Sequence, residues 1–250
     1  MADTDENTAE SRFFFVHVQK TAGTALFTRL KRHFGTHAVY PDASDGDVLT
    51  VMPQLSVDVL RDRWRKRRGE IRVVTGHFPM CTTELLGERF TTLTVVREPV
   101  ERTLSYLRHH RMLTPEDADK PLEAIYEDNF RYHALIHNHM VKMFSLTPSE
   151  MTEGTLTPVE FTSDHLDRAK QQLASVDVLG LQERFDEFCT TLQQRFGWNL
   201  GGPVHANRTE PIEVSNSFRD RIAQDNSMDA ELYAHAERLR EQRRRAGVGT

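Results

Sequence analysis

Short apolar runs alternate with amphipathic stretches through the first half of the chain. Runs rich in β-branched and aromatic residues have the composition of strands buried on both faces. These predicted strands cover residues 13–18, 48–52, 71–75 and 92–96. Apolar positions at helical spacing predict helices over residues 24–34, 56–68 and 99–110. Strands alternating with helices indicate a mainly parallel sheet that is covered on both faces.

The second half is mostly helical in pattern. Helices are predicted over residues 122–128, 130–144, 164–173 and 183–196, and after Asp229. One strand is predicted at 176–179, and long loops at 146–162 and 199–216. We therefore expect an α/β fold: a P-loop-like parallel sheet of four to five strands flanked by helices, with a mostly helical second half. A single domain is expected over 12–250, after a disordered N-terminus at 1–11.

Composition narrows the class of protein. The 250 residues are 38% hydrophobic and 28% charged, which allows both a packed core and a solvated surface. The net charge of −5 gives no overall attraction to nucleic acid or an anionic membrane. The two cysteines cannot form a disulfide framework, and no run is long and apolar enough to span a membrane. We expect a cytoplasmic protein without a nucleic-acid partner or a membrane span.

A candidate anion-binding loop joins the first predicted strand to the first helix. A tight loop before a helix points backbone N–H groups and the positive end of the helix dipole at one spot. Lys20 adds a full charge there, and Thr21 and Thr24 add hydroxyl groups. A nucleoside-triphosphate loop needs two glycines where this chain has Gln19 and Phe14. The loop therefore suits a phosphate ligand handled without magnesium, although an ordinary turn with a lysine is the simpler alternative.

A second candidate phosphate site follows the strand predicted at 92–96. Arg97 comes directly after this strand, Pro99 begins a helix, and Ser105 lies about two turns further along. Helical periodicity places Ser105 where it can converge with Arg97, the residue type best suited to a bidentate grip on phosphate. The alternative is structural: Arg97 pairs with Glu101, and Ser105 only packs.

These motifs resemble those of sulfotransferases that use 3′-phosphoadenosine 5′-phosphosulfate (PAPS). The stretch His-Val-Gln-Lys-Thr-Ala-Gly-Thr at 17–24 resembles their 5′-phosphosulfate loop, and 94–106 resembles their 3′-phosphate motif. The similarity is greatest to the branch of the heparan sulfate 2-O- and 6-O-sulfotransferases. Further similar segments lie at 138–143, 178–186 and 229–233. The resemblance covers most of the chain and suggests a soluble, bacterial-type member of the family.

The resemblance implies a role for each residue of the two motifs. Lys20 would contact the oxygen that bridges phosphate and sulfate. The implied 5′-phosphate loop comprises Lys20, Thr21, Ala22, Gly23, Thr24 and Ala25. Arg97 and Ser105 would hold the 3′-phosphate, and Arg208, in the second long loop, would fold over the nucleotide. The product would be 3′-phosphoadenosine 5′-phosphate (PAP), and no metal is required.

A general base is expected at the carboxyl end of the strand at 71–75, where ligands bind in parallel sheets. His77 stands there after Gly76 and titrates near neutral pH, and its position resembles that of the catalytic histidine in the 2-O-sulfotransferase branch. A structural histidine is the alternative reading. Some sulfotransferases use a glutamate, so Glu84 stays a candidate, while His17 is expected to line the loop or the core.

Two further patterns carry less weight. His133 and His137 have a spacing that can hold zinc, but no third ligand is evident. The basic stretches 61–68 and 238–245 could bind nucleic acid or an anionic glycan, and a solvated helix face is the commoner explanation.

The expected function is transfer of a sulfuryl group from PAPS to an acceptor hydroxyl, on a carbohydrate or glycoconjugate. Two alternatives stay open at this point: a nucleotide-dependent kinase of related fold, and a non-catalytic module that binds a nucleotide or a glycan. The sequence does not identify the acceptor.

Overall fold

A computed structural model describes residues 11–46, 52–202 and 213–247. These residues form a five-stranded sheet in the order β2-β3-β1-β4-β5, in which every pair of neighbours is parallel. The strands are β1 Phe13–Val16, β2 Val39–Tyr40, β3 Val73–Val74, β4 Thr91–Val96 and β5 Val178–Leu181. The predicted α/β fold class is confirmed. Because β1 lies between β3 and β4, the segments that follow these three strands meet at one edge of the sheet.

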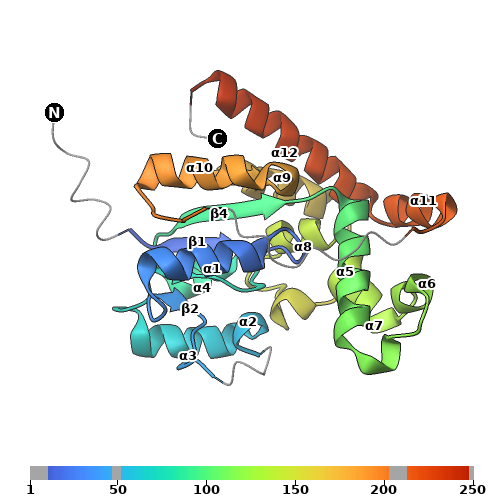
Figure 1. Ribbon diagram of the computed structural model, residues 1–250, viewed down its shortest axis with the longest axis horizontal. Helices are drawn as coiled ribbons and strands as arrows, with labels where there is room; N and C mark the ends of the chain where they lie inside the picture. The colour runs from blue at the N-terminus through green and yellow to red at the C-terminus, as the bar shows by residue number, and fades with distance from the viewer. Residues whose placement is uncertain (1–10, 47–51, 203–212, 248–250) are drawn as a thin grey trace.

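Helices cover both faces of the sheet, and α5 stands across its carboxyl end (Figure 1). The helices are α1 Gly23–Phe34, α2 Met52–Leu55, α3 Val57–Arg67, α4 Thr82–Leu86, α5 Pro99–Leu113, α6 Leu122–Tyr126, α7 Asn129–Arg131, α8 His139–Ser145, α9 Ser163–Ser175, α10 Phe185–Phe196, α11 Asn216–Asp225 and α12 Ser227–Arg245. Short 3₁₀ turns occupy Pro115–Asp117, Gly154–Leu156 and Gln182–Arg184, and a π-helical turn occupies Tyr132–Ile136.

The alternation of side chains along β1 divides the core into two layers. Phe13 and Phe15 pack with α1 and α10 on one face of the sheet. Phe14 and Val16 pack with α3, α8, α9 and α12 on the other face. Every residue of β1 is buried, so water is excluded from both faces of this strand. The central strand is therefore held from both sides, and this fixes the position of the loop that follows it.

The helix predicted over 130–144 is wrong as a single element. The chain forms α7, the π-helical turn and α8, with a break at Asn138, whose φ of 44° is left-handed. Tertiary contacts stabilise the break. The backbone N–H of Asn138 donates to the side chain of Asn226, and the Lys142 ammonium donates to the carbonyl oxygens of His133 and Ala134. Such contacts cannot be read from helical periodicity.

Other boundaries also differ from prediction. Of the strand expected at 48–52, residue Met52 alone is described, and it begins α2. Neither β2 nor α11 was predicted, and α5 continues past residue 110 to Leu113. The segment 1–11, expected to be disordered, lies outside the described residues apart from Ser11. None of the described helices combines the length and the apolar character needed to cross a membrane.

Candidate active site

The loop between β1 and α1 has a constrained backbone. Lys20 and Ala22 both have φ of 68°, a left-handed conformation that non-glycine residues adopt only when the surroundings enforce it. Ala22 is the N-cap of α1 and supplies no side-chain cap, which leaves backbone N–H groups at the start of this helix for a ligand. The buried hydroxyl of Thr21 donates to the carbonyl of Val18 at 2.8 Å, so it stabilises the loop, whereas Thr24 is exposed.

Gly23 is required by the close approach of His17. A Cβ atom on Gly23 would lie 1.7 Å from Nε2 of His17, far inside any real contact distance. The His17 ring therefore rests directly on the first residue of α1. This contact couples the end of β1 to the start of the helix and explains why the loop needs a glycine there.

The structure brings Arg97 to the phosphate loop. Its Nη1 donates to the carbonyl oxygen of Lys20 at 3.2 Å. Burial, together with the charge of Arg97, lowers the pKa of Lys20 to about 8, and burial also lowers the pKa of Arg97. The two motifs thus meet, and two half-buried cations lie together where neither charge is well solvated.

Arg97 and Glu101 form no direct ion pair in the described part of the chain, although, against the larger effect of burial, the charge of Glu101 raises the pKa of Arg97. Within the described part of the chain, the carboxylate of Glu101 forms ion pairs with Arg219 and, at 3.9 Å, with Arg108. Nε of Arg97 is buried and has no hydrogen-bond partner among these residues. Nη1 of Arg97 is thus engaged with the loop, whereas its Nε–H group can donate to a ligand.

Ser105 lies on α5, half-buried, about two turns beyond Pro99. His109 follows one turn later on the same face of α5, and sequence reasoning missed it although the helical period could have found it. Burial and the positive charge of Lys20 lower the pKa of His109. Its Nδ1 is buried without a hydrogen-bond partner within the described residues. His109 is thus a further side chain within electrostatic reach of Lys20.

His77 stands just beyond β3 and is held by two hydrogen bonds. Its backbone N–H donates to the carbonyl of Gln54 at 2.8 Å, and its Nδ1 lies 2.9 Å from the carbonyl oxygen of His17. Because a carbonyl oxygen only accepts, Nδ1 carries the proton and Nε2 holds the free lone pair. The two histidine rings lie 4.3 Å apart, centroid to centroid.

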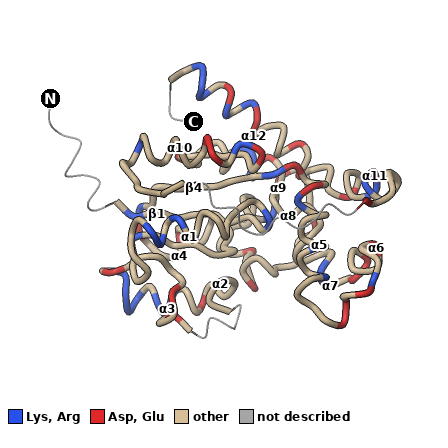
Figure 2. Tube along the Cα trace, in the orientation of Figure 1, with Lys and Arg blue, Asp and Glu red and all other residues tan. Residues whose placement is uncertain are grey.

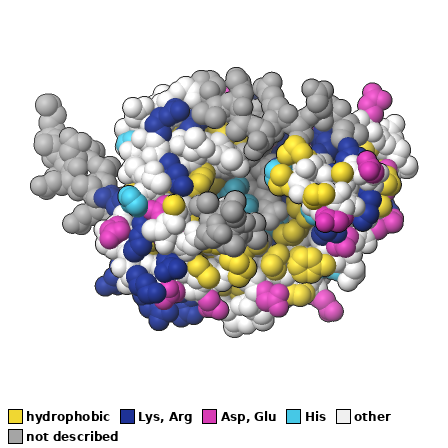
Figure 3. All heavy atoms as spheres, turned by 60° about the horizontal axis from the view of Figure 1, so that its bottom comes forward, with side chains coloured by type: hydrophobic (Ala, Val, Ile, Leu, Met, Phe, Trp, Pro, Cys, Tyr) yellow, Lys and Arg dark blue, Asp and Glu magenta, His cyan; other side chains and the backbone are white. Residues whose placement is uncertain are grey.

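The electrostatic surroundings keep both histidines uncharged. Burial, with a further contribution from Lys20, lowers the pKa of His77 to about 4, against the opposing hydrogen bond to the His17 carbonyl. Burial also lowers the pKa of His17 well below its usual value. Histidine side chains lie in the hollowed middle of the face shown in Figure 3, with hydrophobic side chains beside them. A neutral His77 can accept a proton through Nε2.

A buried polar network holds the elements next to the site. Arg102, fully buried on α5, donates to the carbonyl oxygens of Leu135 and Ile136 at 3.3 and 2.9 Å. Asp229 accepts the backbone N–H groups at the start of α8, and burial raises its pKa to about 6. Arg102, which lies within the segment 94–106 that resembles the 3′-phosphate motif, therefore supports the fold, whereas Arg97 lies at the loop.

The remaining candidates lie elsewhere or outside the described residues. Glu84 is exposed on α4, and Arg208 falls within 203–212, which the structure does not describe. His137 stacks on Tyr132. Over the ranges 11–46, 52–202 and 213–247, no group of three or more His, Cys, Asp or Glu residues is arranged to hold a metal ion.

No known family model matches the chain, and no curated protein matches it. The resemblance to the sulfotransferases therefore stays a prediction, and the arguments for function come from the geometry of the site.

Proposed function

We propose that this protein is a sulfotransferase that moves a sulfuryl group from PAPS to a hydroxyl group of a carbohydrate acceptor and releases PAP. The observation that carries the proposal is the meeting of two segments that are 77 residues apart. The Arg97 guanidinium contacts the carbonyl of Lys20, so both motifs that resemble phosphate sites of this family face one region. A ligand with phosphates at two positions fits such a pair of cations.

Donor binding is assigned to the cations and main chain at the carboxyl edge of the sheet. Backbone N–H groups at the start of α1 and the Lys20 ammonium would hold the 5′-phosphosulfate, and Arg97 with Ser105 would hold the 3′-phosphate. The lowered pKa values of Lys20 and Arg97 support this assignment, since burial makes both charged forms costly even though Glu101, Glu183 and Glu98 partly offset this effect at Arg97. A bound anion would relieve that cost.

The chemical step requires a base and a cation that stabilises the leaving group. His77 takes the proton of the acceptor hydroxyl at Nε2 while that oxygen forms a bond to sulfur. The bond between sulfur and the phosphate oxygen breaks, and Lys20 neutralises the charge left on that oxygen. The negative donor raises the pKa of His77 from about 4 towards neutrality, which makes it a stronger base in the complex.

A comparison of nucleotides tests the class of enzyme. PAP and ATP with Mg²⁺ are titrated separately into the protein by calorimetry. The proposal predicts binding of PAP and much weaker binding of ATP, since the loop lacks both triphosphate-loop glycines. A clear preference for ATP with Mg²⁺ would identify a kinase instead.

A second experiment tests catalysis. The protein is incubated with PAPS labelled in the sulfur and with a panel of glycans and cell extracts, and the labelled product is identified. The variant His77→Ala should lose transfer and keep PAP binding, whereas His133→Ala, at an exposed position, serves as the matched control. Unchanged transfer by His77→Ala would remove His77 from the mechanism. PAP binding without any labelled product would favour the non-catalytic module.

A further inference from the structure

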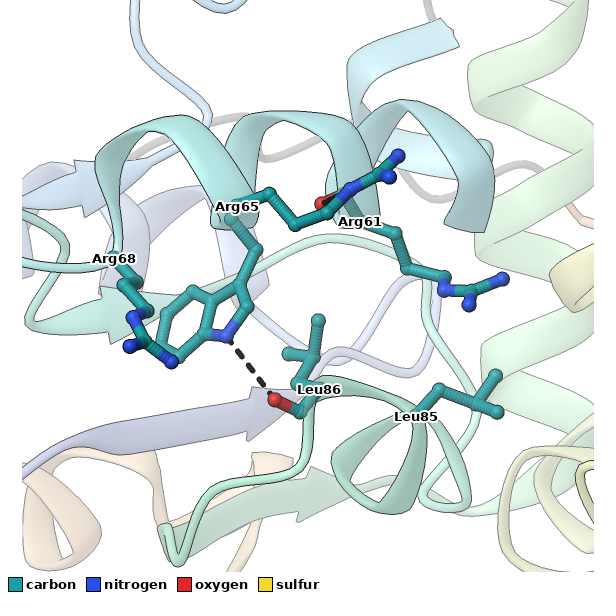
Figure 4. A pocket seen from close by; sticks show the side chains of 6 residues that line it. Arg61, Arg65, Arg68, Leu85 and Leu86 are labelled. Carbon is teal, nitrogen blue, oxygen red and sulfur yellow. Dashed lines mark hydrogen bonds between the residues drawn. The ribbon is translucent and has the colours of Figure 1, made fainter.

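A cavity of about 310 Å³ lies between α3 and α4 (Figure 4). Its lining combines cationic and apolar side chains: Arg61, Trp64, Arg65, Arg68, Leu85 and Leu86. Figure 4 shows Arg61, Arg65 and Arg68 above the two leucines, with the guanidinium groups of Arg61 and Arg65 pointing away from that of Arg68. A pocket of this size is at the lower end of the range that holds small molecules.

The cavity lies away from the candidate active site. The rings of Trp64 and Phe90 lie 5.4 Å apart between centroids. The Arg12 guanidinium lies 5.3 Å from the centroid of the Trp64 ring. Phe90 directly precedes β4, and Arg12 directly precedes β1. This places the cavity at the amino ends of the strands, whereas the phosphate loop follows the carboxyl end of β1.

The three arginines share one face of α3 and its C-terminal cap. Positions 61, 65 and 68 are four and three residues apart, so the side chains start about 6 and 4.5 Å apart along the helix axis. Basic residues are concentrated on α3 in Figure 2, and they form a dense cationic area at one side of the face in Figure 3. The spacing suits two or three anionic groups arranged in a row.

Carboxylates near these arginines neutralise them poorly. Their ion-pair partners are Asp58 at 3.9 Å from Arg61, Asp62 at 4.0 Å from Arg65, and Glu88 at 3.7 Å from Arg68, all beyond a good hydrogen bond. Asp62 is instead bonded to Lys66 at 2.8 Å, and Glu88 is paired with Arg12 at 3.0 Å. The three guanidinium groups are therefore only loosely paired with carboxylates. Nε of Arg65 also donates to the carbonyl oxygen of Arg61 at 3.4 Å, and the remaining N–H groups can donate to an anion.

The floor of the pocket restricts the kind of anion. Nε1 of Trp64 donates to the carbonyl of Leu86 at 3.2 Å, and the residue is only 4% exposed. The ring thus offers no open face on which a nucleic-acid base can stack, which disfavours single-stranded nucleic acid. Sulfate and phosphate groups need only the guanidinium donors, and an apolar body can lie on Leu85.

We propose that this pocket is a second anion-binding site, specific for small molecules that carry two or more phosphate or sulfate groups. Arg61, Arg65 and Arg68 bind the charged groups, and the apolar floor receives the body of the ligand. The site is independent of the proposed sulfotransferase activity, because its residues lie at the opposite edge of the sheet from Lys20 and Arg97.

Calorimetry with two probes tests the proposal. Inorganic tripolyphosphate and sucrose octasulfate are titrated at low ionic strength into the protein saturated with PAP. The variant Arg61→Gln/Arg65→Gln/Arg68→Gln should bind both probes about 100-fold more weakly, from the loss of several charge-assisted hydrogen bonds. The control Arg238→Gln/Arg244→Gln/Arg245→Gln removes the same charge from α12 and should bind like the parent protein. Tighter binding of one probe assigns a sulfate-bearing or a phosphate-bearing ligand, and either supports the site.

Three outcomes would overturn it. An equal loss in the α12 control would show that net charge alone is responsible. Loss of probe binding in Lys20→Ala would place the probe in the phosphate loop. Tighter binding of a single-stranded oligonucleotide through the same arginines would identify a nucleic-acid surface. If the triple variant fails to fold, Arg65→Gln replaces it, because Arg65 is 77% exposed and its weaker probe binding can be measured on a folded protein.

Discussion

Cations gather at both ends of the same parallel sheet, but in different physical settings. At the carboxyl edge, Lys20 and Arg97 are half-buried, and the loop that carries Lys20 has a left-handed backbone. At the amino edge, the side chains of Arg61, Arg65 and Arg68 are 51%, 77% and 65% exposed on a regular helix and its cap. A fixed, partly desolvated arrangement selects one ligand geometry, whereas exposed arginines respond mainly to the number of negative charges on a ligand.

The same contrast occurs between neighbours on α3. Arg67, 14% exposed, donates to Asp45 at 2.6 Å and to Asp42 at 3.2 Å, and both carboxylates are buried. Burial alone would raise the pKa of Asp42, but hydrogen bonds from Ser44 and the charge of Arg67 together lower it to about 2. Within this basic stretch, Arg67 therefore stabilises the fold, and the next residue, Arg68, lines the pocket.

The substitution Arg67→Ala is expected to have the largest effect. It leaves two buried carboxylates without their cation, which costs about 3 kcal/mol of unfolding free energy. Arg65→Ala, two residues away and exposed, is expected to cost less than about 0.5 kcal/mol. Urea denaturation of both variants measures the difference. Equal losses would contradict the division of these arginines into structural and ligand-binding groups.

The substitution Arg97→Ala should weaken PAP binding about 100-fold, because it removes charge-assisted hydrogen bonds to a phosphate worth roughly 1.5–3 kcal/mol each. It should leave the affinity of the amino-edge pocket for sucrose octasulfate unchanged. Arg111→Ala, near the end of α5, is the control, and calorimetry measures all three proteins. A similar loss of PAP affinity in both variants would remove Arg97 from the donor site.

Much of the fold could be predicted because its elements obey simple periodicities. The buried run at 13–16, the helix α1 and the Ser56 cap of α3 all follow from residue type and spacing. The elements that were missed depend on distant partners. The strand β2 has two residues, too few for any pattern, and the break at Asn138 is stabilised by a hydrogen bond to Asn226, 88 residues away.

In the candidate site, too, the features that depend on distant partners could not be predicted. The order of motifs along the chain predicts that Lys20, His77 and Arg97 follow three parallel strands, and the sheet order brings the ends of these strands together. The protonated Nδ1 of His77 and the contact between His17 and Gly23 depend on the approach of separate segments, so residue type alone could not reveal them. The division of the basic stretch at 61–68 likewise depends on where Asp42 and Asp45 lie.

The substitution Gly23→Ala tests whether the carboxyl edge depends on fixed geometry. The new Cβ would overlap the His17 ring, so the ring or the start of α1 must move. We expect PAP affinity to fall about 30-fold, since the loop N–H groups lose their alignment with a charged phosphate. Gly69→Ala, just beyond α3, is the matched control because its Cβ meets nothing within 4 Å. Unchanged affinity in Gly23→Ala would show a loop that adapts to its ligand.

The smallest expected effect is a difference in how ligand affinity depends on pH at the carboxyl edge and at the amino edge of the sheet. Lys20, with its pKa lowered to about 8 by burial and Arg97, is charged below that pH and loses its charge above it. PAP binds the charged form, so its affinity should fall about tenfold between about pH 7 and pH 9, a range in which its phosphates stay ionised. Calorimetry across this range measures the fall.

Arginines stay charged throughout the same range, so the affinity of the amino-edge pocket for sucrose octasulfate should be constant. Lys20→Arg provides the decisive control, since a guanidinium at position 20 should flatten the PAP profile whatever its effect on absolute affinity. A sloping profile in Lys20→Arg would assign the titration to another group. A flat profile in the parent protein would show that Lys20 does not bind the nucleotide as a titrating cation.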